Sequence, residues 1–471
     1  MLTLGHLAGC DNDLAVSKVV IDSRQAQAGS VFYAFCGERV DGHDYVLAAL
    51  QRGAMAAFVE QDVPGVSAIE PAQVAALTLD DLPVAVRVAS TQAALQQAAA
   101  RYRTALDLDV VAVTGSVGKT TAKEAIAAVA SQGHRVLKSE GNANNELGLP
   151  LTLLEAEATH QMAVLEMGMY ARGEIALLCQ VARPRIGVVT NVQPVHLERL
   201  GSIEAIAQAK SELVAALPTD GVAVLNGDDP RVAAMAGLFE GVSIMVGWGE
   251  ANHVRLTAVE PLGLAGTRID LAVAGLEALG VTPARRSLHC LMLGQHAAMP
   301  AALSVAVGLA LGLDWEQMQQ GLTQLGYGPR LIPRPGQRSV TLLDDAYNAS
   351  PSAVTGALQV LADLPGRRVA VLGDMLELGA AEEQCHRDIG ALCARCADLL
   401  ITRGARARWI AAGAIAAGLA AAQITSCDDN ADVLAALDGL AQEGDTILIK
   451  GSRGMAMEEV VAGWLRPETQ A

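Results

Sequence analysis

Aromatic side chains are scarce in this chain. Phenylalanine, tryptophan and tyrosine make up 3% of its 471 residues, whereas hydrophobic residues together reach 51%. A core with few large rings must be filled by small aliphatic side chains, which suits helices packed on sheets. A chain of this length exceeds one hydrophobic core, so about three domains are expected. The composition therefore predicts an α/β protein of several domains.

Positive charge is also in short supply. Lysine and arginine number 34 against 51 acidic residues, which gives a formal net charge of −17. Such a surface repels phosphate backbones and anionic lipids, so it argues against a nucleic-acid partner and a general membrane surface. Local clusters of Arg and Lys would still hold a phosphorylated ligand.

Long apolar runs are absent as well. No stretch of about 18 uninterrupted apolar residues occurs, and the start, Met1–His6, lacks a basic segment followed by an apolar core. We therefore expect a soluble cytoplasmic protein without membrane insertion. The eight cysteines include one Cys-x-x-Cys pair, Cys393 and Cys396, and no second pair at zinc-site spacing. They are interpreted as reduced thiols rather than metal ligands.

The most informative segment that is present is Asp109–Glu124. A β-branched run predicts a buried parallel strand over 110–113, and a helix is expected over 120–130 directly after a glycine turn. Backbone N–H groups of the turn and the positive end of the helix would hold a phosphate. Lys119 would reach the outer phosphates, and the Thr120 hydroxyl would ligate Mg²⁺. The candidate ATP-binding residues here are Gly115, Ser116, Val117, Gly118, Lys119, Thr120 and Thr121.

This turn is shorter than the strict phosphate-loop pattern, which needs a glycine where Val113 stands. A short Gly-x-x-Gly-Lys-Thr also arises by chance in solvated loops. The predicted strand before it and helix after it disfavour that interpretation.

The chain divides into three blocks. Residues 1–88 mix short strands with glycine turns, residues 89–328 begin with a helix and contain the phosphate loop, and residues 329–471 follow a Gly- and Pro-rich stretch, 326–336, interpreted as a linker. In the third block strands alternate with helical segments, which predicts a second doubly wound domain. The expected strands are 30–35, 162–165, 186–190, 222–225, 340–343, 368–372, 399–402 and 446–449.

Polar residues follow three of the central strands. Glu166, Asn191 and the segment Asn226–Asp229 stand where these strands end. Ligands of open parallel sheets gather at the carboxyl ends of the strands, so a site is expected at this edge. A carboxylate at the end of a buried strand is costly unless it is paired or binds metal, which favours a functional role for Glu166.

Lys210 interrupts the apolar face of a predicted helix over 202–217, in which Ile203, Ile206 and Leu217 continue the stripe. One interpretation is a lysine whose stem is buried and whose ammonium reaches water. The other is a partly desolvated amine with a lowered pKa, which reacts with CO₂ to form a carbamate. A carbamate is an anionic oxygen ligand that suits Mg²⁺.

Other candidates keep two interpretations each. His196 is a loop histidine or a ligand. Asp344 and Asp345, followed by Asn348, end a predicted strand, where two adjacent carboxylates face a cation or ribose more often than they close a turn. Three asparagines after the phosphate-loop helix also suit turns; they are Asn142, Asn144 and Asn145.

A set of motifs, in order along nearly the whole chain, resembles the Mur ligases and most closely their dipeptide-adding MurF type. They are Asp22-Ser-Arg24, Gly37-x-x-x-Asp-Gly-His43, the phosphate loop through Glu124, Gly141-Asn-x-Asn-Asn-x-x-Gly-x-Pro150, Glu166-Met-Gly-Met169 with Gly173-Glu-Ile175, Thr190-Asn191 with His196-Leu197, Ala209-Lys210, Arg330-Leu331, Asp344-Asp-Ala-Tyr-Asn-Ala349, Val371–Gly379 with His386, and Lys450-Gly-Ser-Arg453.

The resemblance implies a central P-loop ATPase-like domain with a parallel sheet, flanked by a small N-terminal α/β domain that binds a UDP-sugar and a C-terminal Rossmann-like domain. It implies that ATP and Mg²⁺ are used to join UDP-N-acetylmuramoyl tripeptide to D-alanyl-D-alanine through an acyl phosphate, in a monomeric enzyme of peptidoglycan precursor synthesis.

The resemblance also implies residue roles. Lys119, Lys210, His196 and Glu166 would be catalytic, and Thr120, Glu166, His196 and carbamylated Lys210 would bind metal. Asn145, Arg330 and Asp344 would contact ATP. The substrate-binding residues would be Asp22, Ser23, Arg24, Asp41, Gly42, His43 and Asn348.

Two departures from the family pattern stand out. Pro300 replaces the asparagine that usually contacts adenine, and Gln193-Pro-Val195 replaces a commoner Gly-containing stretch before His196. The alternatives are another Mur-type or folylpolyglutamate-type amide ligase, or a non-catalytic nucleotide-dependent binding protein. The amino-acid-adding type usually carries Asp-Asn-Pro-Arg where this chain reads Ile401–Arg408. Retention of both predicted metal sites weakens the non-catalytic alternative.

Overall fold

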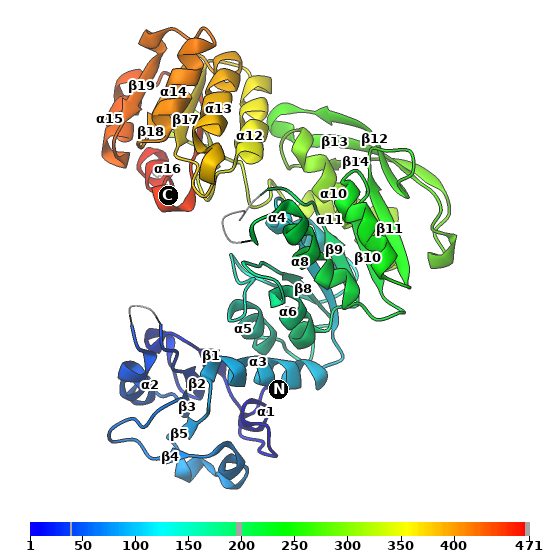
Figure 1. The fold of residues 1–471 in the computed structure, drawn as a ribbon, viewed down its shortest axis with the longest axis vertical. Coiled ribbons are helices and arrows are strands. Elements are labelled where there is room, and N and C mark those ends of the chain that lie inside the picture. The colour runs from blue at the N-terminus through cyan, green and yellow to red at the C-terminus, as the bar shows by residue number, and fades with distance from the viewer. Residues whose placement is uncertain (38–39, 195–199, 467–471) are drawn as a thin grey trace.

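A computed structural model describes residues 1–37, 40–194 and 200–466. It contains three β-sheets, each with its own helices, and the central sheet lies between the other two (Figure 1). The α/β fold with parallel-rich sheets agrees with the expectation from sequence.

The N-terminal sheet has five parallel strands in the order β1-β2-β3-β5-β4. Its first two strands carry buried aliphatic and aromatic side chains on both faces, as parallel strands covered by helices do. The strands are β1 Lys18–Val20, β2 Ser30–Tyr33, β3 Ala56–Val59, β4 Ala68–Ile69 and β5 Val84–Arg87.

The central sheet has nine strands, and it is mixed rather than parallel throughout. Strands β6 to β11 run parallel to one another. Strand β13 pairs antiparallel with both β12 and β14. The order is β14-β13-β12-β11-β10-β9-β6-β8-β7. The strands are β6 Asp109–Thr114, β7 Val136–Lys138, β8 Met162–Glu166, β9 Ile186–Val189, β10 Val222–Asn226, β11 Val242–Gly247, β12 Val254–Pro261, β13 Thr267–Val273 and β14 Ala284–Cys290.

The C-terminal sheet corrects the linker prediction for 326–336. Ile332–Pro335 forms β15, an antiparallel edge strand that pairs with β16. Proline lacks a donor N–H, so Pro333 and Pro335 are tolerated there because the strand has only one neighbour. The order is β15-β16-β20-β17-β18-β19. The other strands are β16 Thr341–Asp345, β17 Arg368–Gly373, β18 Leu399–Arg403, β19 Ile424–Cys427 and β20 Thr446–Lys450.

The helices cover the sheets. They are α1 Leu4–Ala8, α2 Val46–Gln51, α3 Thr91–Thr104, α4 Lys119–Ala130, α5 Gly148–Leu154, α6 Glu174–Ala182, α8 Ile203–Ala215, α9 Pro230–Ala233, α10 Ala298–Ala310, α11 Trp315–Gln324, α12 Pro351–Asp363, α13 Glu382–Cys396, α14 Ala407–Ala416, α15 Asn430–Leu440 and α16 Glu458–Trp464. None of those in the described part of the chain has the length and apolar character needed to cross a bilayer.

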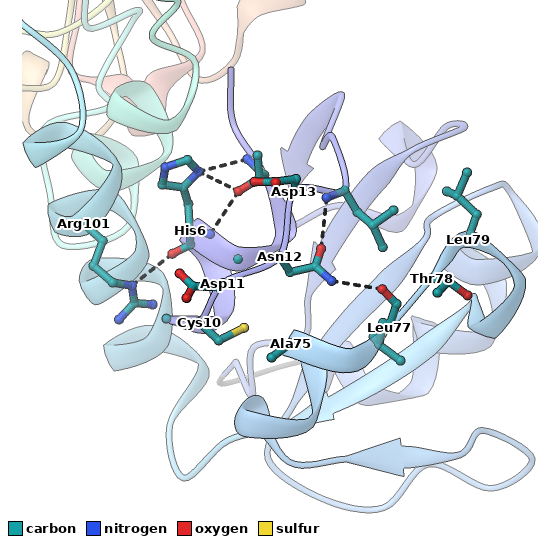
Figure 2. Close-up of a pocket in the computed structure, with 14 residues that line it drawn as sticks. His6, Cys10, Asp11, Asn12, Asp13, Ala75, Leu77, Thr78, Leu79 and Arg101 are labelled. Carbon is teal, nitrogen blue, oxygen red and sulfur yellow. Dashed lines mark hydrogen bonds between the residues drawn. The ribbon is translucent and has the colours of Figure 1, made fainter.

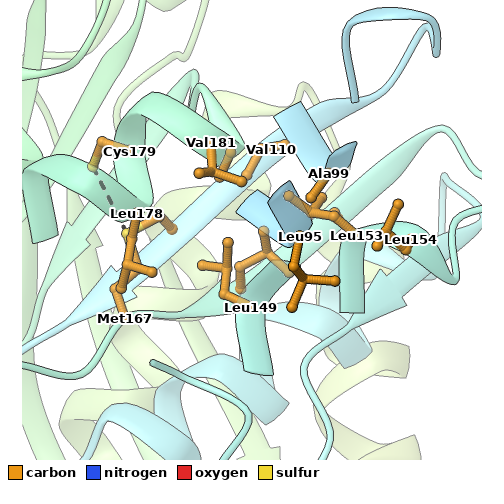
Figure 3. Packing of buried hydrophobic residues seen from close by; sticks show 14 of the residues in the cluster. Leu95, Ala99, Val110, Leu149, Leu153, Leu154, Met167, Leu178, Cys179 and Val181 are labelled. Carbon is orange, nitrogen blue, oxygen red and sulfur yellow. Dashed lines mark hydrogen bonds between the residues drawn. The ribbon is translucent and has the colours of Figure 1, made fainter. Parts of the chain in front are cut away.

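Helix α3 joins the first two parts of the molecule through a shared core. Its residues Leu95 and Ala99 pack with Leu149 and Leu153 of α5 and with Leu178 of α6 (Figure 3). The same cluster of buried residues reaches α1 and the N-terminal sheet. Because burial of such side chains is the main stabilising term, the phosphate-loop sheet is anchored on one side to the N-terminal part.

Candidate functional site

The phosphate loop has the predicted strand, turn and helix. Strand β6 ends at Thr114, and α4 begins at Lys119 after a left-handed Gly118 with φ 83°. Gly115 has φ 147°, and a Cβ there would lie 1.9 Å from Thr190 Oγ1. A side chain at this position would clash, so glycine is required for the loop to lie against the end of β9.

Two lysines converge on this loop. Lys119 Nζ donates to the carbonyl oxygens of Gly115 at 2.9 Å and Ser116 at 3.1 Å, and Lys210 Nζ donates to the same Gly115 oxygen at 2.8 Å. Lys210 is 3% exposed, so its amine does not reach water. Burial lowers the pKa of Lys210 well below the usual 10.5, and the Lys119 ammonium lowers it further. The desolvated-amine interpretation of Lys210 therefore fits the geometry.

Glu166 lies at the end of β8, beside Val113 of β6, and is 3% exposed. Its Oε1 accepts a hydrogen bond from Asn144 Nδ2 at 2.8 Å, whereas its Oε2 is buried without a partner. Buried carboxylate oxygens are normally satisfied, so an unpartnered one marks a place for a ligand. A hard divalent cation such as Mg²⁺ suits this oxygen.

The other predicted metal ligands are less fully defined. His196 lies outside the described residues. Thr120 is half-buried in the first turn of α4. Within the described ranges, no group of three or more His, Cys, Asp or Glu side chains is gathered as a metal site.

Asn191 clamps the phosphate loop, a role that sequence reasoning did not assign. Its Oδ1 accepts from the Val117 N–H at 2.9 Å, and its Nδ2 donates to the Val117 carbonyl at 2.8 Å. Thr190 Oγ1 donates to the same carbonyl at 2.8 Å. Both backbone hydrogen-bonding groups of Val117 are thus held by residues at the end of β9. The position of Asn191 directly after a predicted strand was the available signal in the sequence.

Gln193, one of the departures from the family pattern, contacts both the phosphate loop and the C-terminal part of the molecule. Its N–H donates to Ser116 Oγ of the phosphate loop at 2.9 Å. Its Oε1 accepts from Ser352 Oγ, in the first turn of α12, at 3.2 Å. This segment therefore links the loop to the C-terminal part.

The two adjacent asparagines after α4 make different contacts. Asn145 is exposed, and its Oδ1 accepts from the N–H groups of Leu147 at 3.3 Å and Gly148 at 2.8 Å. Asn144 is the residue that contacts Glu166. Spacing alone does not tell which of two adjacent amides bonds to Glu166, and the contact of Asn145 with ATP stays a prediction.

The N-terminal candidates form two local arrangements. Asp22 and Arg24 make an ion pair at 2.7 Å, and the Arg24 hydrogen bond lowers the pKa of Asp22 to about 2. Ser23 is buried between them. His43 is also buried, with Nδ1 bonded to Asp41 Oδ1 at 2.6 Å and Nε2 accepting from the Glu60 N–H at 2.9 Å. Both ring nitrogens are engaged, so His43 shapes its loop.

The structure explains why glycine stands at position 42, between Asp41 and His43. A Cβ there would lie 2.8 Å from the Phe35 backbone, which leaves no room for a side chain. The close approach of the two backbones therefore needs glycine.

In the C-terminal part, Arg330 and Asp344 line a cavity of about 180 Å³ with Asp345, Tyr347 and Arg453. Arg330 stacks on the Tyr347 ring at 4.0 Å. Asp344 pairs with Arg334 at 2.8 Å. This cavity lies at the carboxyl ends of parallel strands, where the sequence predicts a nucleotide.

Asp345, which sequence reasoning left without a role of its own, is the more constrained carboxylate. It is 6% exposed and pairs with buried Lys450 at 2.5 Å, while its Oδ1 is buried without a partner. Lys450 also donates to the Asn348 carbonyl at 2.8 Å, and Asn348 itself is exposed. The orphaned oxygen makes Asp345 a better candidate than Asp344 for contact with a bound polar group.

Pro300 is buried in the first turn of α10. Helix N–H groups in the first turn have no intrahelical partner, so proline is accommodated there. The position offers a bound base no amide.

Another cavity, of about 900 Å³, lies in the N-terminal part (Figure 2). It is bounded by α1, the loop after it and residues 75–79, with Arg101 of α3 donating to the His6 carbonyl at 3.0 Å. None of the predicted site residues lines it.

Comparison with known proteins agrees with this arrangement. The family model described as "Mur ligase family, catalytic domain" matches residues 15–103, "Mur ligase middle domain" matches 113–307, and "Mur ligase, glutamate ligase domain" matches 330–453.

Individual proteins match over nearly the full length. A Bacillus subtilis (strain 168) protein named UDP-N-acetylmuramoyl-tripeptide–D-alanyl-D-alanine ligase is 36% identical over 447 residues, which cover 94% of this chain and 92% of that protein. A crystal structure of MurF from Acinetobacter baumannii matches with a TM-score of 0.83 and 30% identity, over 98% of this chain and 97% of the other. MurF ligase from Thermotoga maritima in complex with ADP matches with a TM-score of 0.79 and 27% identity, over 96% and 98%.

Proposed function

Because this chain belongs to the Mur ligase family, we propose specific roles for its residues in an ATP-dependent ligation. The chain is a ligase that adds D-alanyl-D-alanine to a UDP-N-acetylmuramoyl tripeptide in peptidoglycan synthesis. The observation that carries the residue assignment is the convergence of Lys119 and Lys210 on the Gly115 carbonyl.

The phosphate loop binds the triphosphate of ATP. Its backbone N–H groups and the start of α4 face the phosphates, while Lys119 exchanges its loop carbonyls for phosphate oxygens. Support comes from the clamp of Asn191 and Thr190 on Val117, which fixes the loop before nucleotide arrives. Asn145 is assigned to the same ligand by motif.

The chemical problem is that a free carboxylate is a poor acylating group. The terminal carboxylate oxygen of the tripeptide attacks the γ-phosphorus, ADP leaves, and an acyl phosphate forms. The dipeptide amine then attacks the acyl carbon, loses its proton, and releases phosphate with formation of the amide bond. Bound Mg²⁺ would neutralise charge on the phosphates during transfer.

Glu166, Thr120, His196 and Lys210 are the residues proposed to hold Mg²⁺. The buried, unpartnered Oε2 of Glu166 supports the assignment, because it offers a charged oxygen with no competing partner. The lowered pKa of Lys210 supports its reaction as a neutral amine with CO₂, which yields an anionic carbamate.

Residues of the N-terminal and C-terminal parts are proposed to bind the outer parts of the substrates. Asp22, Ser23, Arg24 and the loop of Asp41, Gly42 and His43 are proposed to bind the UDP-sugar. Arg330 and Asp344, with Asp345, are proposed to bind the nucleotide, and Asn348 is proposed to bind substrate. The protein is further proposed to act as a cytoplasmic monomer.

Hydroxylamine tests the acyl-phosphate proposal, because it captures such intermediates as hydroxamates. With UDP-N-acetylmuramoyl tripeptide, ATP and Mg²⁺ but no dipeptide, hydroxamate should accumulate with matching ADP. The Lys119→Ala variant provides the matched control and should form little. Absence of hydroxamate from an enzyme that still forms the amide would contradict this route.

A further inference from the structure

A buried lysine below the phosphate loop has no part in the roles above. Lys123 lies one helical turn after Lys119 in α4 and is fully buried. A buried ammonium is costly unless it is paired and hydrogen-bonded, so its partners indicate what it holds in place. Its Nζ donates to the Ser139 carbonyl oxygen and forms an ion pair with Glu124 Oε1 at 2.6 Å.

The pairing with lysines keeps the Glu124 carboxylate charged. Burial works to raise the pKa of Glu124, but hydrogen bonds from Lys123 and Lys138 outweigh it and lower that pKa. Lys138 is the outer partner, at 2.7 Å from Glu124 Oε2 and with a side chain 37% exposed. Lys123 is therefore the member that reaches inward to Ser139.

Ser139 carries the contact on to Glu166. It is fully buried directly after β7, and its Oγ accepts a hydrogen bond from the Glu166 N–H at 3.1 Å. Its own N–H donates to the Val164 carbonyl at 3.1 Å. Since Asn144 holds Glu166 Oε1, the backbone and one carboxylate oxygen are fixed, and only Oε2 lacks a partner.

We propose that Lys123 and Ser139 are positioning residues that hold Glu166 so that its Oε2 is presented to the metal. The contacts tie α4, which begins with the phosphate-binding Lys119, to the end of β8, which carries the metal-binding carboxylate. These contacts thereby fix the spacing between Lys119 and Glu166. The inference rests on the proposed role of Glu166 as a Mg²⁺ ligand.

Mn²⁺ binding to the full-length protein in the presence of ADP, followed by electron paramagnetic resonance, tests this role. Ser139→Ala removes the acceptor for the Glu166 N–H but keeps the carbonyl that Lys123 uses. Lys123→Met keeps the length of the side chain and removes its charge and donors. Each should weaken Mn²⁺ binding by about 10-fold or more, because outer partners set the orientation of a ligand.

Two controls separate positioning from general destabilisation. Lys138→Met removes the outer partner of Glu124, whose ammonium donates to Glu124 Oε2, and should change Mn²⁺ affinity by less than about 2-fold. Binding of ADP without metal should also change by less than about 2-fold in Ser139→Ala, since the phosphate loop itself is untouched.

Glu166→Gln distinguishes the possible failures. If this variant binds Mn²⁺ as the parent does, the proposed metal role of Glu166 is wrong and the inference falls with it. If it loses Mn²⁺ while folded Ser139→Ala and Lys123→Met retain parental affinity, the positioning role alone is overturned. A lower melting temperature with unchanged Mn²⁺ affinity also overturns it. If Lys123→Met does not fold, Ser139→Ala decides the question.

Discussion

A single ammonium group, that of Lys119, lies within 3.1 Å of two phosphate-loop carbonyls, where the outer phosphates of ATP are expected. Lys119→Ala removes this charge from the transferring phosphoryl group, and such stabilisation is commonly worth about 3 to 4 kcal/mol. Amide formation should fall by at least about 100-fold. Steady-state ADP release, with circular dichroism to verify folding, measures the effect. Near-normal turnover would remove the loop from the mechanism.

Lys210 should be irreplaceable by another cation. Lys210→Ala should be nearly inactive, and acetate should partly restore activity by supplying a carboxylate at the vacated ligand position. Lys210→Arg should stay inactive, because a guanidinium remains protonated and forms no carbamate. Activity is measured with increasing acetate, and chloride at equal ionic strength is the control. A fully active alanine variant would refute the carbamate role.

Stability should also report on the buried amine of Lys210. Its pKa is lowered in the native state, so between that value and 10.5 the unfolded chain binds a proton that the native chain does not. The free energy of unfolding should therefore rise with pH in this window, and it should rise less in Lys210→Met. Urea unfolding in CO₂-free buffers from about pH 7 to about pH 10 covers the window. Parallel curves for the two proteins would contradict the lowered pKa.

Single residues differ in how far the sequence reveals them. Lys210 was recognisable because a charge interrupts an apolar stripe, and Lys119 because it follows a glycine turn. The contact of Asn144 with Glu166 and the pairing of Asp345 with Lys450 were not recognisable. Adjacent residues of loops and strand ends point in different directions, and tertiary contacts decide which one faces the site.

At the scale of elements, the end of β9 braces the phosphate loop through Asn191. Asn191→Ala removes two hydrogen bonds to the backbone of Val117, each worth about 0.5 to 1.5 kcal/mol. ADP binding, measured by calorimetry, should weaken about 5-fold or more. Asn252→Ala, which removes a half-buried side-chain amide that donates to Asp228 and Gly249, is the control. Parental ADP affinity in the Asn191 variant would show that the clamp does not shape the site.

The central parallel strands were predictable because burial on both faces makes their sequences continuously apolar. The expected strand at 110–113 is β6, and the expected helix at 120–130 is α4. In the central sheet, β7 and the strands β11 to β14 were missed. β13 alternates buried Ile269, Leu271 and Val273 with more exposed residues, and this period of two was the overlooked signal.

At the scale of the whole molecule, the residues proposed to bind the UDP-sugar and the nucleotide are spread over three sheets. Composition and strand pattern predicted several α/β domains, and the ordered motifs predicted the family. The contact of Gln193 with Ser352 was not predictable, because it joins residues far apart in the sequence through side chains at the surface. Local patterns specify elements, whereas contacts between domains depend on how complete domains meet.

The choice of amine tests the central claim most directly. ADP release is measured with ATP, Mg²⁺ and UDP-N-acetylmuramoyl tripeptide, with each component omitted in turn and with D-alanyl-D-alanine, lysine or diaminopimelate as the amine. A site built for a dipeptide leaves buried polar groups unpaired when a single amino acid binds, at about 1 to 3 kcal/mol per group. Two such groups would already give D-alanyl-D-alanine a preference of roughly 30-fold or more. A better rate with lysine or diaminopimelate and UDP-N-acetylmuramoyl dipeptide would contradict the assignment.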